Sequence, residues 1–438
     1  MVTGFDPTGK GFYHGGDLKG VLSRLDYIQA LGATGHESAG YHGYWITDFT
    51  HVDPHFGTDA DMHALADAVH ARGMKLYMDI VVNHTADVIG YRECSSSACP
   101  YRSRADYPYS RRGGLAGEEI NRGFLGDAAP YQTDENFAKL TRPDYAYTPF
   151  VPPGQEHVKV PEWLNDPIYY HNRSNSTFRG ESSTMGDFFV LDDVMTENPR
   201  VVRGFIEIFG DWIDKYGIDG FRIDTAQHVN PEFWSVRETV AGSVGTERLA
   251  ELLAEDAMYE GGATGARQLP TFISNHDAGR FGYFVRKARP HAADGEVLRR
   301  VTLAYAMLMT LRGVPVIYYG DEQGFASSVG DQDSRQDMFA SKTAAYNAER
   351  LIGTLATTAQ SNFSADHPLY KAITTLAMLR RANPTSMQGI DAQVEVDPHS
   401  QRFRSWRGSC APAESAPGSY RVQVPALDYL ICASVAAP

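Results

Sequence analysis

Long apolar runs, basic clusters and cysteine are scarce in this chain of 438 residues. Each shortage excludes some classes of function. No apolar stretch reaches the roughly 18 residues that span a membrane, so no membrane segment is expected. The net charge is -14, and no segment gathers lysine and arginine. Because phosphate contacts need concentrated positive charge, nucleic acid is not expected as a partner.

Only four cysteines occur, in two locally spaced pairs, Cys94 with Cys99 and Cys410 with Cys432. This spacing favours short disulfides that close loops, although four cysteines allow three connectivities and four free thiols in a cytosolic protein remain an alternative. Disulfides indicate a secreted or periplasmic location. Residues 1–15 contain neither a basic start nor an apolar run, so no signal peptide is predicted within them.

Length and composition describe a loop-rich globular protein. The chain is roughly two to three times the usual domain size, which fits one large barrel with a small appended domain as well as three compact domains. Aromatic residues reach 11%, with 24 tyrosines. Such rings can stack on a neutral, hydroxyl-covered ligand such as a sugar, although most of them are expected in the core.

Apolar periodicity alternates between helix and strand, which is typical of an α/β fold. Helices are predicted over 17–31 and 59–72, and the second leads into KLYMDIVVNH, a buried parallel strand. Two later helices are predicted at 198–216 and 296–312, and three later strands at 218–225, 269–277 and 313–323.

Two parts of the chain depart from this alternation. Residues 85–190 are rich in Gly, Pro, Ser, Tyr and Arg and are too long for a connecting loop, which predicts an irregular inserted subdomain. After about residue 385 short alternating strands such as SYRVQVPAL predict a small β domain. The predicted domains are a first barrel part at 1–84, the inserted subdomain at 85–190, a second barrel part at 191–385 and a shortened β domain at 386–438.

Each apolar strand ends in a polar cluster. The clusters are Asp79, Asn83 and His84; Arg222, Asp224 and His228; Asn275, His276 and Asp277; and Asp321 and Glu322. In parallel barrels the C-terminal strand ends form one rim, so these groups are expected to converge there. Arg222 and Asp224 lie on the same strand face, which predicts an ion pair between them. An ion pair with a purely structural role is the alternative for this strand taken alone.

Such a rim can perform glycoside hydrolysis. One carboxylate attacks the anomeric carbon while a carboxylic acid protonates the leaving oxygen. Arginine beside the nucleophile keeps it ionised. His84 and His276 can hydrogen-bond sugar hydroxyls, although either alone is more often a structural histidine.

The strings DIVVNH, GFRIDTAQHV and SNHD resemble three signature regions of the α-amylase family, glycoside hydrolase family 13. The resemblance extends to YHGYWITDF, FGTDADMHALADAVHARGMKLYMD and GVPVIYYGDEQ, and so covers stretches over most of residues 10–385. It implies a TIM (β/α)8-type barrel with an inserted subdomain and a small C-terminal β domain.

The resemblance also implies roles for single residues. Asp224 would be the nucleophile, Arg222 its positioning partner and Asp277 the carboxylate that binds and distorts the sugar. The residues that would contact the substrate are Tyr44, His84, His276, Gln227 and His228, with Tyr44 stacked beneath the sugar. Gln227 departs from the lysine commonly found there, which puts the neighbouring subsite in question.

A structural calcium is implied as well. Asn83, Asp193 and the main-chain oxygen of His228 resemble the family's calcium ligands, and hard oxygen ligands suit this ion. The alternative for Asp193 is an ordinary capping or turn residue.

The general acid of the family, a glutamate ending a strand between the nucleophile and NHD strands, is not identifiable. Only 53 positions separate Asp224 from Asp277, and the interval predicts helix throughout. Glutamates within it, on predicted solvated helix faces, include Glu232, Glu238, Glu247, Glu251 and Glu255. Residues 31–34 also run directly into GHESAGYHGYW where a barrel strand is expected, so about four of eight strands are legible and internal segments are missing.

We expect an α-amylase-like hydrolase that acts on α-1,4-glucan, such as starch and maltooligosaccharides, and cleaves it with retention through Asp224. Two alternatives stay open, a catalytically impaired glucan-binding protein and a transglycosylase with the same site. The chain is expected to be a monomer.

Overall fold

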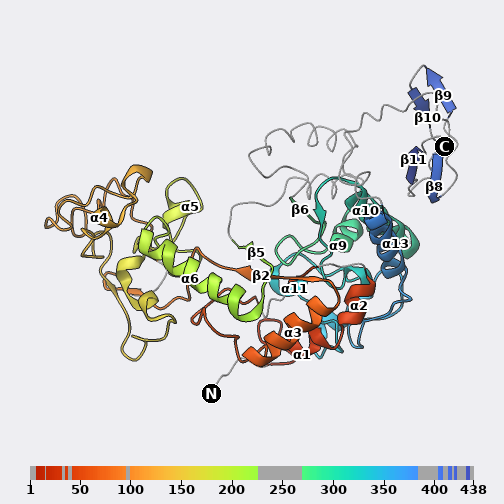
Figure 1. The fold of residues 1–438 in the computed structure, drawn as a ribbon, viewed down its shortest axis with the longest axis horizontal. Coiled ribbons are helices and arrows are strands. Elements are labelled where there is room, and N and C mark those ends of the chain that lie inside the picture. Colours follow the sequence, from red (N-terminus) through yellow and green to blue (C-terminus); the bar gives the residue numbers. More distant parts are fainter. Residues whose placement is uncertain are drawn as a thin grey trace. The chain divides into compact units, whose positions relative to one another are not determined.

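The computed structural model describes residues 6–14, 16–31, 42–94, 99–224 and 269–382, together with the backbone of five further short strands. The chain forms two compact units, each described here by itself (Figure 1). Unit 1 consists of Met1–Gly16, Arg24–Ala33 and His228–Pro438. Unit 2 consists of Asp17–Ser23 and Thr34–Gln227.

Unit 2 contains a parallel three-stranded sheet in the order β1-β2-β5. Its strands are β1 (Gly35–Glu37), β2 (Lys75–Ile80) and β5 (Gly220–Ile223). The second and third confirm strands predicted from apolar runs. The first corrects the expectation that no strand follows residues 31–34, because GHE pairs with KLY of β2.

One helix precedes β2 and another precedes β5, and local sequence signals mark the ends of these helices. Helix α3 (Asp59–Ala71) begins at a capping box between Thr58 and Asp61 and packs against β2. Helix α6 (Pro199–Tyr216) begins at Asn198 and Pro199, as predicted, and ends at Gly217, whose φ of 70° is left-handed. A cap with a left-handed φ turns the chain sharply, so β5 follows after a short link.

The segment between β2 and α6 is largely irregular, as expected for 85–190. Its short elements are β3 (Gly90–Tyr91), η1 (Ala129–Tyr131), α4 (Asp134–Phe137), β4 (Pro149–Phe150), η2 (Glu162–Asn165), η3 (Pro167–Tyr169) and α5 (Ser182–Met185). Tyr109, Phe137 and Tyr145 belong to an apolar core of this segment. The predicted Cys94–Cys99 disulfide is present, whereas the pairing of Cys410 and Cys432 falls outside the described side chains.

The helix predicted over 17–31 is wrong as a single element. The structure has α1 (Leu18–Leu22) in unit 2 and α2 (Leu25–Ala30) in unit 1. Asp17 caps the first helix by accepting a hydrogen bond from the backbone N–H of Gly20 at 2.6 Å.

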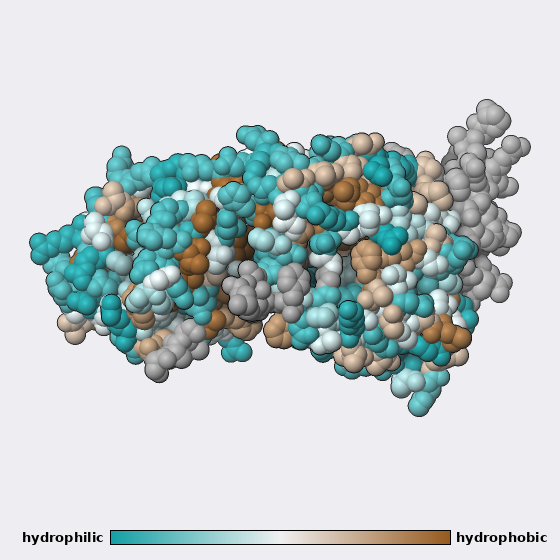
Figure 2. Space-filling model, turned by 90° about the horizontal axis from the view of Figure 1, so that it is seen from below, coloured by the Kyte–Doolittle hydropathy of each residue, from teal (hydrophilic) through white to brown (hydrophobic). Residues whose placement is uncertain are grey.

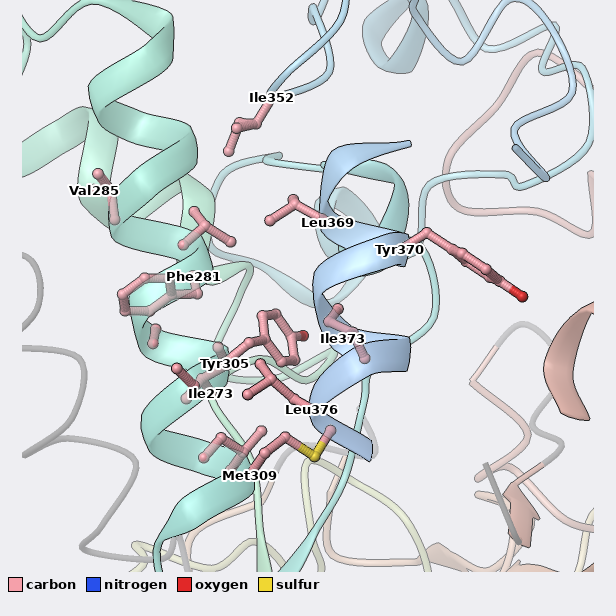
Figure 3. Packing of buried hydrophobic residues seen from close by; sticks show 14 of the residues in the cluster. Ile273, Phe281, Val285, Tyr305, Met309, Ile352, Leu369, Tyr370, Ile373 and Leu376 are labelled. Carbon is pink, nitrogen blue, oxygen red and sulfur yellow. The ribbon is translucent and has the colours of Figure 1, made fainter. Parts of the chain in front are cut away.

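Unit 1 is built around an apolar cluster between α10 (Asp294–Thr310) and α13 (Pro368–Ala382). Figure 3 shows Ile373 and Leu376 of α13 pointing toward Tyr305 and Met309 of α10. The other elements of this part are β6 (Pro270–Thr271), α9 (Phe281–Ala288), β7 (Val314–Pro315), η6 (Asp321–Gln323), α11 (Asp331–Ser334) and α12 (Ala344–Asn347). Strands β6 and β7 pair in parallel and confirm two predicted strand segments, although both strands are short.

The C-terminal part contains two antiparallel strand pairs, which agrees with the predicted β-rich end. Its strands are β8 (Phe403–Arg407), β9 (Ala413–Ala416), β10 (Ser419–Arg421) and β11 (Ile431–Ser434). Strand β8 pairs with β11 and β9 pairs with β10.

The surface is mixed in polarity. Figure 2 shows hydrophilic side chains with smaller apolar areas among them on the visible face. Within the described ranges, no helix has both the length and the apolar character that crossing a bilayer requires.

Candidate active site

Strands β2 and β5 bring three charged side chains of unit 2 together. Asp79 of β2 lies opposite Arg222 of β5 in the parallel register. Asp224 follows β5 directly, and its backbone N–H donates to the Ile80 carbonyl at 2.8 Å, which extends the ladder by one residue. Since residues two apart share a strand face, Arg222 and Asp224 point the same way.

Arg222 binds both carboxylates through one nitrogen. Its Nη1 donates to Asp224 Oδ1 at 2.6 Å and to both oxygens of Asp79 at 2.9 Å. The predicted ion pair between Arg222 and Asp224 is therefore confirmed. Asp79 is a second partner of the guanidinium.

Tyr44 completes this group. Its hydroxyl donates to Asp79 Oδ2 at 2.9 Å. Burial and the nearby negative charge of Asp79 raise the pKa of Tyr44, so the phenol keeps its proton and remains a donor.

The electrostatics of the group favour a charged arginine. Burial lowers the pKa of Arg222, but the charge of Asp79 more than offsets this and raises it overall. Burial raises the pKa of Asp79, while Arg222 and Tyr44 oppose that rise. Arg222 is therefore a permanent cation in contact with both carboxylates.

His84 lies in the same unit and is almost completely buried. Burial lowers its pKa to about 4, so the imidazole is neutral at neutral pH, although the charge of Asp224 opposes this shift. Its Nε2 is buried and has no hydrogen-bond partner among the described residues. A neutral imidazole with one unpaired nitrogen is suited to a polar ligand, and the substrate contact of His84 stays a prediction.

The predicted calcium ligands Asn83 and Asp193 are adjacent. Asn83 Nδ2 lies 3.2 Å from Asp193 Oδ1, and residues 84 and 193 form an isolated β-bridge. His171 Nδ1 contacts Asp193 Oδ2 at 2.6 Å, and its Nε2 contacts Glu197 Oε1 at 2.9 Å. Burial lowers the pKa of His171, but Glu197 and Asp193 raise it overall to about 10, so this imidazole carries a charge.

More buried charge surrounds this pair. Lys159 Nζ forms an ion pair with Asp192 at 2.6 Å, and both side chains are almost fully buried. Asp187 is also buried, and its Oδ1 accepts from the backbone N–H of Asp193 at 3.3 Å. Burial and the charges of Asp192 and Asp193 raise the pKa of Asp187 well above its usual range. This region concentrates more carboxyl groups than basic groups.

His276 and Asp277 belong to unit 1. His276 Nε2 lies 3.3 Å from Asp277 Oδ2, and the Asp277 side chain is exposed. One ligand atom each from His276, Asp277 and Asp331 fall within 4.8 Å of one another. Their predicted convergence with Asp224 on one sugar stays a prediction, as do the domain boundaries.

Several predicted residues lie outside the described part of the chain. They are Gln227, His228 and the glutamates between residues 232 and 255. The identity of the general acid therefore stays open.

Sequence reasoning missed two partners. The sequence predicts Asp79 in a strand-end cluster but gives it no role. The parallel pairing of β2 with β5 sets Asp79 opposite Arg222. The apolar run that predicts β2 was therefore the available signal for this contact. His171 gave no comparable local signal. Its pairing with Asp193 depends on the irregular segment between them.

Most of the chain resembles known proteins. The family model "Alpha amylase, catalytic domain" matches residues 4–247 and 257–389. An α-amylase of Streptomyces lividans is 39% identical over 462 residues, covering 90% of this chain and 49% of that protein. A cyclomaltodextrin glucanotransferase of Geobacillus stearothermophilus is 26% identical, covering 86% of this chain and 50% of that protein.

The chain thus spans about half the length of these curated relatives. The first alignment, at 462 residues, is longer than this chain of 438, so it contains gaps opposite positions that the chain lacks. This agrees with the prediction that internal segments are missing.

Among solved structures, an α-amylase from Geobacillus thermoleovorans has a TM-score of 0.58 at 22% identity, covering 89% of this chain and 77% of that one. This likeness supports the predicted fold class, in which parallel strands alternate with helices. Since the family model matches most of the residues and the sequence signatures carry the paired Arg222 and Asp224, the chain belongs to the α-amylase family.

Proposed function

We propose that the protein cleaves α-1,4-linked glucan, such as starch or maltooligosaccharides, with retention of configuration. In this reaction the carboxylate of Asp224 attacks the anomeric carbon, and the leaving oxygen takes a proton from a carboxylic acid. Water then displaces Asp224 from the same carbon. Two inversions restore the original configuration.

The observation that carries the proposal is the contact of Arg222 Nη1 with Asp224 Oδ1 at 2.6 Å. This contact limits the rotation of the Asp224 carboxylate. Asp79 binds the same guanidinium nitrogen with both of its carboxylate oxygens. Tyr44 supplies a ring face on which a sugar can stack. The neutral His84 supplies an unpaired nitrogen that can hydrogen-bond a sugar hydroxyl.

Asp224→Asn tests the nucleophile. The change is nearly isosteric, so the fold should be retained, while an amide cannot form the glycosyl intermediate. We expect cleavage of starch and of an activated aryl glucoside to be abolished, with an unchanged circular dichroism spectrum. An active Asp224→Asn protein would refute the assignment.

The general acid is tested by comparing two substrates. An aryl glucoside with a good leaving group needs no proton, whereas starch does. Turnover of both substrates indicates a complete acid and nucleophile pair. Turnover of the aryl substrate alone indicates a glucan-binding protein without general acid catalysis, since losing the acid costs a factor of roughly 10² to 10⁴ in rate.

A transglycosylase is the second candidate, favoured by the 26% identity with the cyclomaltodextrin glucanotransferase. Both reactions pass through the same intermediate on Asp224. They differ in whether water or a sugar hydroxyl attacks it. Added acceptor sugar appears in longer products only if the protein transfers.

We also propose a structural calcium ion at Asn83 and Asp193, with the main-chain oxygen of His228 as a third ligand. Carboxamide and carboxylate oxygens are the hard donors that calcium prefers. The buried carboxyl groups of Asp187, Asp192 and Asp193 exceed the two buried basic groups near them, Lys159 and His171, and a divalent cation would offset this excess. When bound, the ion supplies structural cross-linking.

An oxidising, secreted or periplasmic location is proposed from the Cys94–Cys99 disulfide. Titration of free thiols in protein from a reducing and an oxidising compartment tests this proposal. We expect loss of these two thiols in the oxidising compartment. Two reactive thiols at these positions in the native protein would contradict it.

A further inference from the structure

His171 lies between two carboxylates of unit 2. Its Nδ1 is 2.6 Å from Asp193 Oδ2, its Nε2 is 2.9 Å from Glu197 Oε1, and the ring is fully buried. An ionised carboxylate only accepts hydrogen bonds, so each ring nitrogen must donate one, and both can donate only in the doubly protonated imidazole. His171 is therefore a cation that two anions share.

Backbone contacts fix the place of this cation. The His171 N–H donates to the Asp193 carbonyl at 3.1 Å, and the His171 carbonyl accepts from the Tyr145 hydroxyl at 2.9 Å. The Val194 N–H donates to the Asn83 carbonyl at 2.9 Å. These contacts hold the imidazole in line with the pair of Asn83 and Asp193.

The two oxygens of Asp193 have different surroundings. His171 contacts Oδ2, whereas Oδ1 lies 3.2 Å from Asn83 Nδ2. The neighbouring carboxylate of Asp192 accepts from Lys159 Nζ at 2.6 Å and from two backbone N–H groups at 3.0 and 3.1 Å, so it is already engaged. Asp193 Oδ1, beside Asn83, is therefore the oxygen that suits calcium.

Glu197 determines how much negative charge Asp193 retains. The carboxylates of Asp193 and Glu197 and the imidazolium of His171 together carry one net negative charge. Without Glu197, the imidazolium would cancel the charge of Asp193, and a divalent cation would meet a neutral pair. Burial raises the pKa of Glu197, but the charge of His171 more than offsets this and lowers it overall, so Glu197 is ionised in the folded protein.

We propose that His171 and Glu197 are positioning residues for the calcium ion. His171 holds Asp193 by Oδ2 and so keeps Oδ1 on the side of Asn83, while Glu197 neutralises His171 and preserves the charge of Asp193 for calcium. The inference rests on the proposed ion and deepens it, because neither residue is a proposed ligand. Groups that hydrogen-bond a ligating side chain typically change metal affinity by a factor of roughly 10 to 100.

Glu197→Gln tests the role of the charge. The amide oxygen of glutamine can still accept from His171 Nε2, so the contact is retained while the negative charge is lost. We expect calcium affinity to fall about tenfold, measured by calorimetric titration of calcium into the chelator-treated full chain at neutral pH. Glu197→Asp keeps the charge and should bind calcium more tightly than Glu197→Gln does.

A double variant tests whether Glu197 acts through His171. In a His171→Gln protein no imidazolium remains for Glu197 to neutralise. Adding Glu197→Gln to that protein should weaken calcium binding by less than about twofold, because the effects of two changes in one contact are not additive. Equal losses with and without His171 would mean that Glu197 acts on the ion by its own charge, and the role given to His171 would be wrong.

Glu162→Gln is the matched control. Glu162 Oε1 contacts His157 Nδ1 at 2.6 Å in the same unit, and both side chains are exposed. This variant removes the same charge from the same kind of contact, so it should leave the calcium affinity unchanged. A loss as large as that of Glu197→Gln would be an effect of overall charge and would contradict the inference.

The outcomes separate this inference from the proposed ion. If the parent binds no calcium, the ion fails and the inference fails with it. If the parent binds calcium and Glu197→Gln binds it equally well, the inference alone is overturned. If His171→Gln does not fold, the comparison of Glu197→Gln with Glu197→Asp still decides, since equal affinities of these two variants would contradict the role of the charge.

Discussion

Arg222 uses one nitrogen to bind two carboxylates with different tasks. Asp79 accepts from Arg222 with both oxygens and from Tyr44, which makes it an anchor for the guanidinium. Asp224 is the carboxylate that we expect to meet the substrate. Asp79 is thus a positioning residue that acts through Arg222.

Asp79→Asn should lower activity without unfolding the protein. The amide retains the shape but removes one of the charges that hold Arg222, so Asp224 loses part of its fixed geometry. We expect kcat on the aryl glucoside to fall by a factor of roughly 10 to 100, with a smaller change in KM. Because burial already raises the pKa of Asp79, replacing its charge should change the melting temperature little.

Asp219→Asn is the matched control. Asp219 precedes β5 and binds Lys75 Nζ at 2.6 Å and the Leu76 N–H at 2.9 Å. Its partners overcome the effect of burial and lower its pKa to about 2, so its charge stabilises the fold. This variant should be less stable and retain its kcat. Equal effects of both variants on kcat would contradict the role given to Asp79.

Glu322 is a buried carboxyl group whose ionisation opposes folding. Its Oε1 accepts from the Tyr27 hydroxyl at 2.9 Å, and its Oε2 has no partner among the described residues. Burial raises its pKa from 4.5 to about 7. The folded protein therefore binds this proton more tightly than the unfolded chain does.

The stability contribution of protonated Glu322 is complete below about pH 4.5 and is lost as the pH rises to about 7. Glu322→Gln stays neutral and should remove this loss, on the order of 3 kcal/mol between these limits. Urea unfolding of both proteins from pH 4.5 to 8 measures it. Parallel pH profiles of the two proteins would contradict the prediction.

At the level of secondary structure elements, apolar runs predicted the strands that carry the site. KLYMDI and GFRI became β2 and β5 as predicted, although only Leu76 and Ile80 of β2 are buried and no residue of β5 is. The three residues of β1, GHE, contain no apolar signal. Their strand conformation comes from pairing with β2, which local sequence does not report.

The predicted helix over 17–31 failed for a related reason. Apolar spacing continues across Ser23 and Arg24, but the chain leaves the helix there and enters the other compact unit. Periodicity describes which face is apolar and does not reveal a change of direction. Tertiary contacts decided this boundary.

The site was predictable where its residues are close in sequence. Arg222 and Asp224 are two positions apart on one strand, so their pairing followed from strand geometry. The contact of Asn83 with Asp193 came from resemblance alone, because 110 residues separate them.

Helix α3 offers a test at this level. Thr58→Ala removes the hydroxyl that accepts from the Asp61 N–H in the capping box. The helix then loses a partner for one terminal N–H group, which should cost about 1 kcal/mol of stability. The midpoint of urea unfolding measures this loss.

Thr375→Ala in α13 provides the control for the cap. Thr375 is an exposed threonine inside a helix, and its hydroxyl donates to the Lys371 carbonyl at 2.8 Å. Alanine is the better helix former, so this variant should be as stable as the parent or slightly more stable. Equal losses in both variants would show that the cap has no special role.

For the whole molecule, the proposed calcium ion predicts a stability that depends on chelators. An ion that binds only the folded protein stabilises it by about 2.7 kcal/mol at a concentration 100 times its Kd. We expect a chelator to lower the Tm by several degrees and added calcium to restore it. Differential scanning calorimetry measures both changes.

Asn83→Ala should make the Tm insensitive to the chelator, because it removes a proposed ligand. Asn165→Ala is a comparison at an asparagine whose side chain donates to the Lys159 carbonyl and which is not a proposed ligand. That variant should keep the response to calcium whatever its own Tm. A Tm of the parent that does not change in chelator would count against the ion.

The path of the chain has a consequence for dissecting this protein. The backbone passes between unit 1 and unit 2 after residues 16, 23, 33 and 227. No single truncation can therefore isolate either whole unit, and a gene fragment that starts at residue 1 and ends after residue 23, 33 or 227 encodes pieces of both. Engineers who want one half alone would have to rejoin distant segments with new linkers, and chimaeras with relatives would need several matched crossover points.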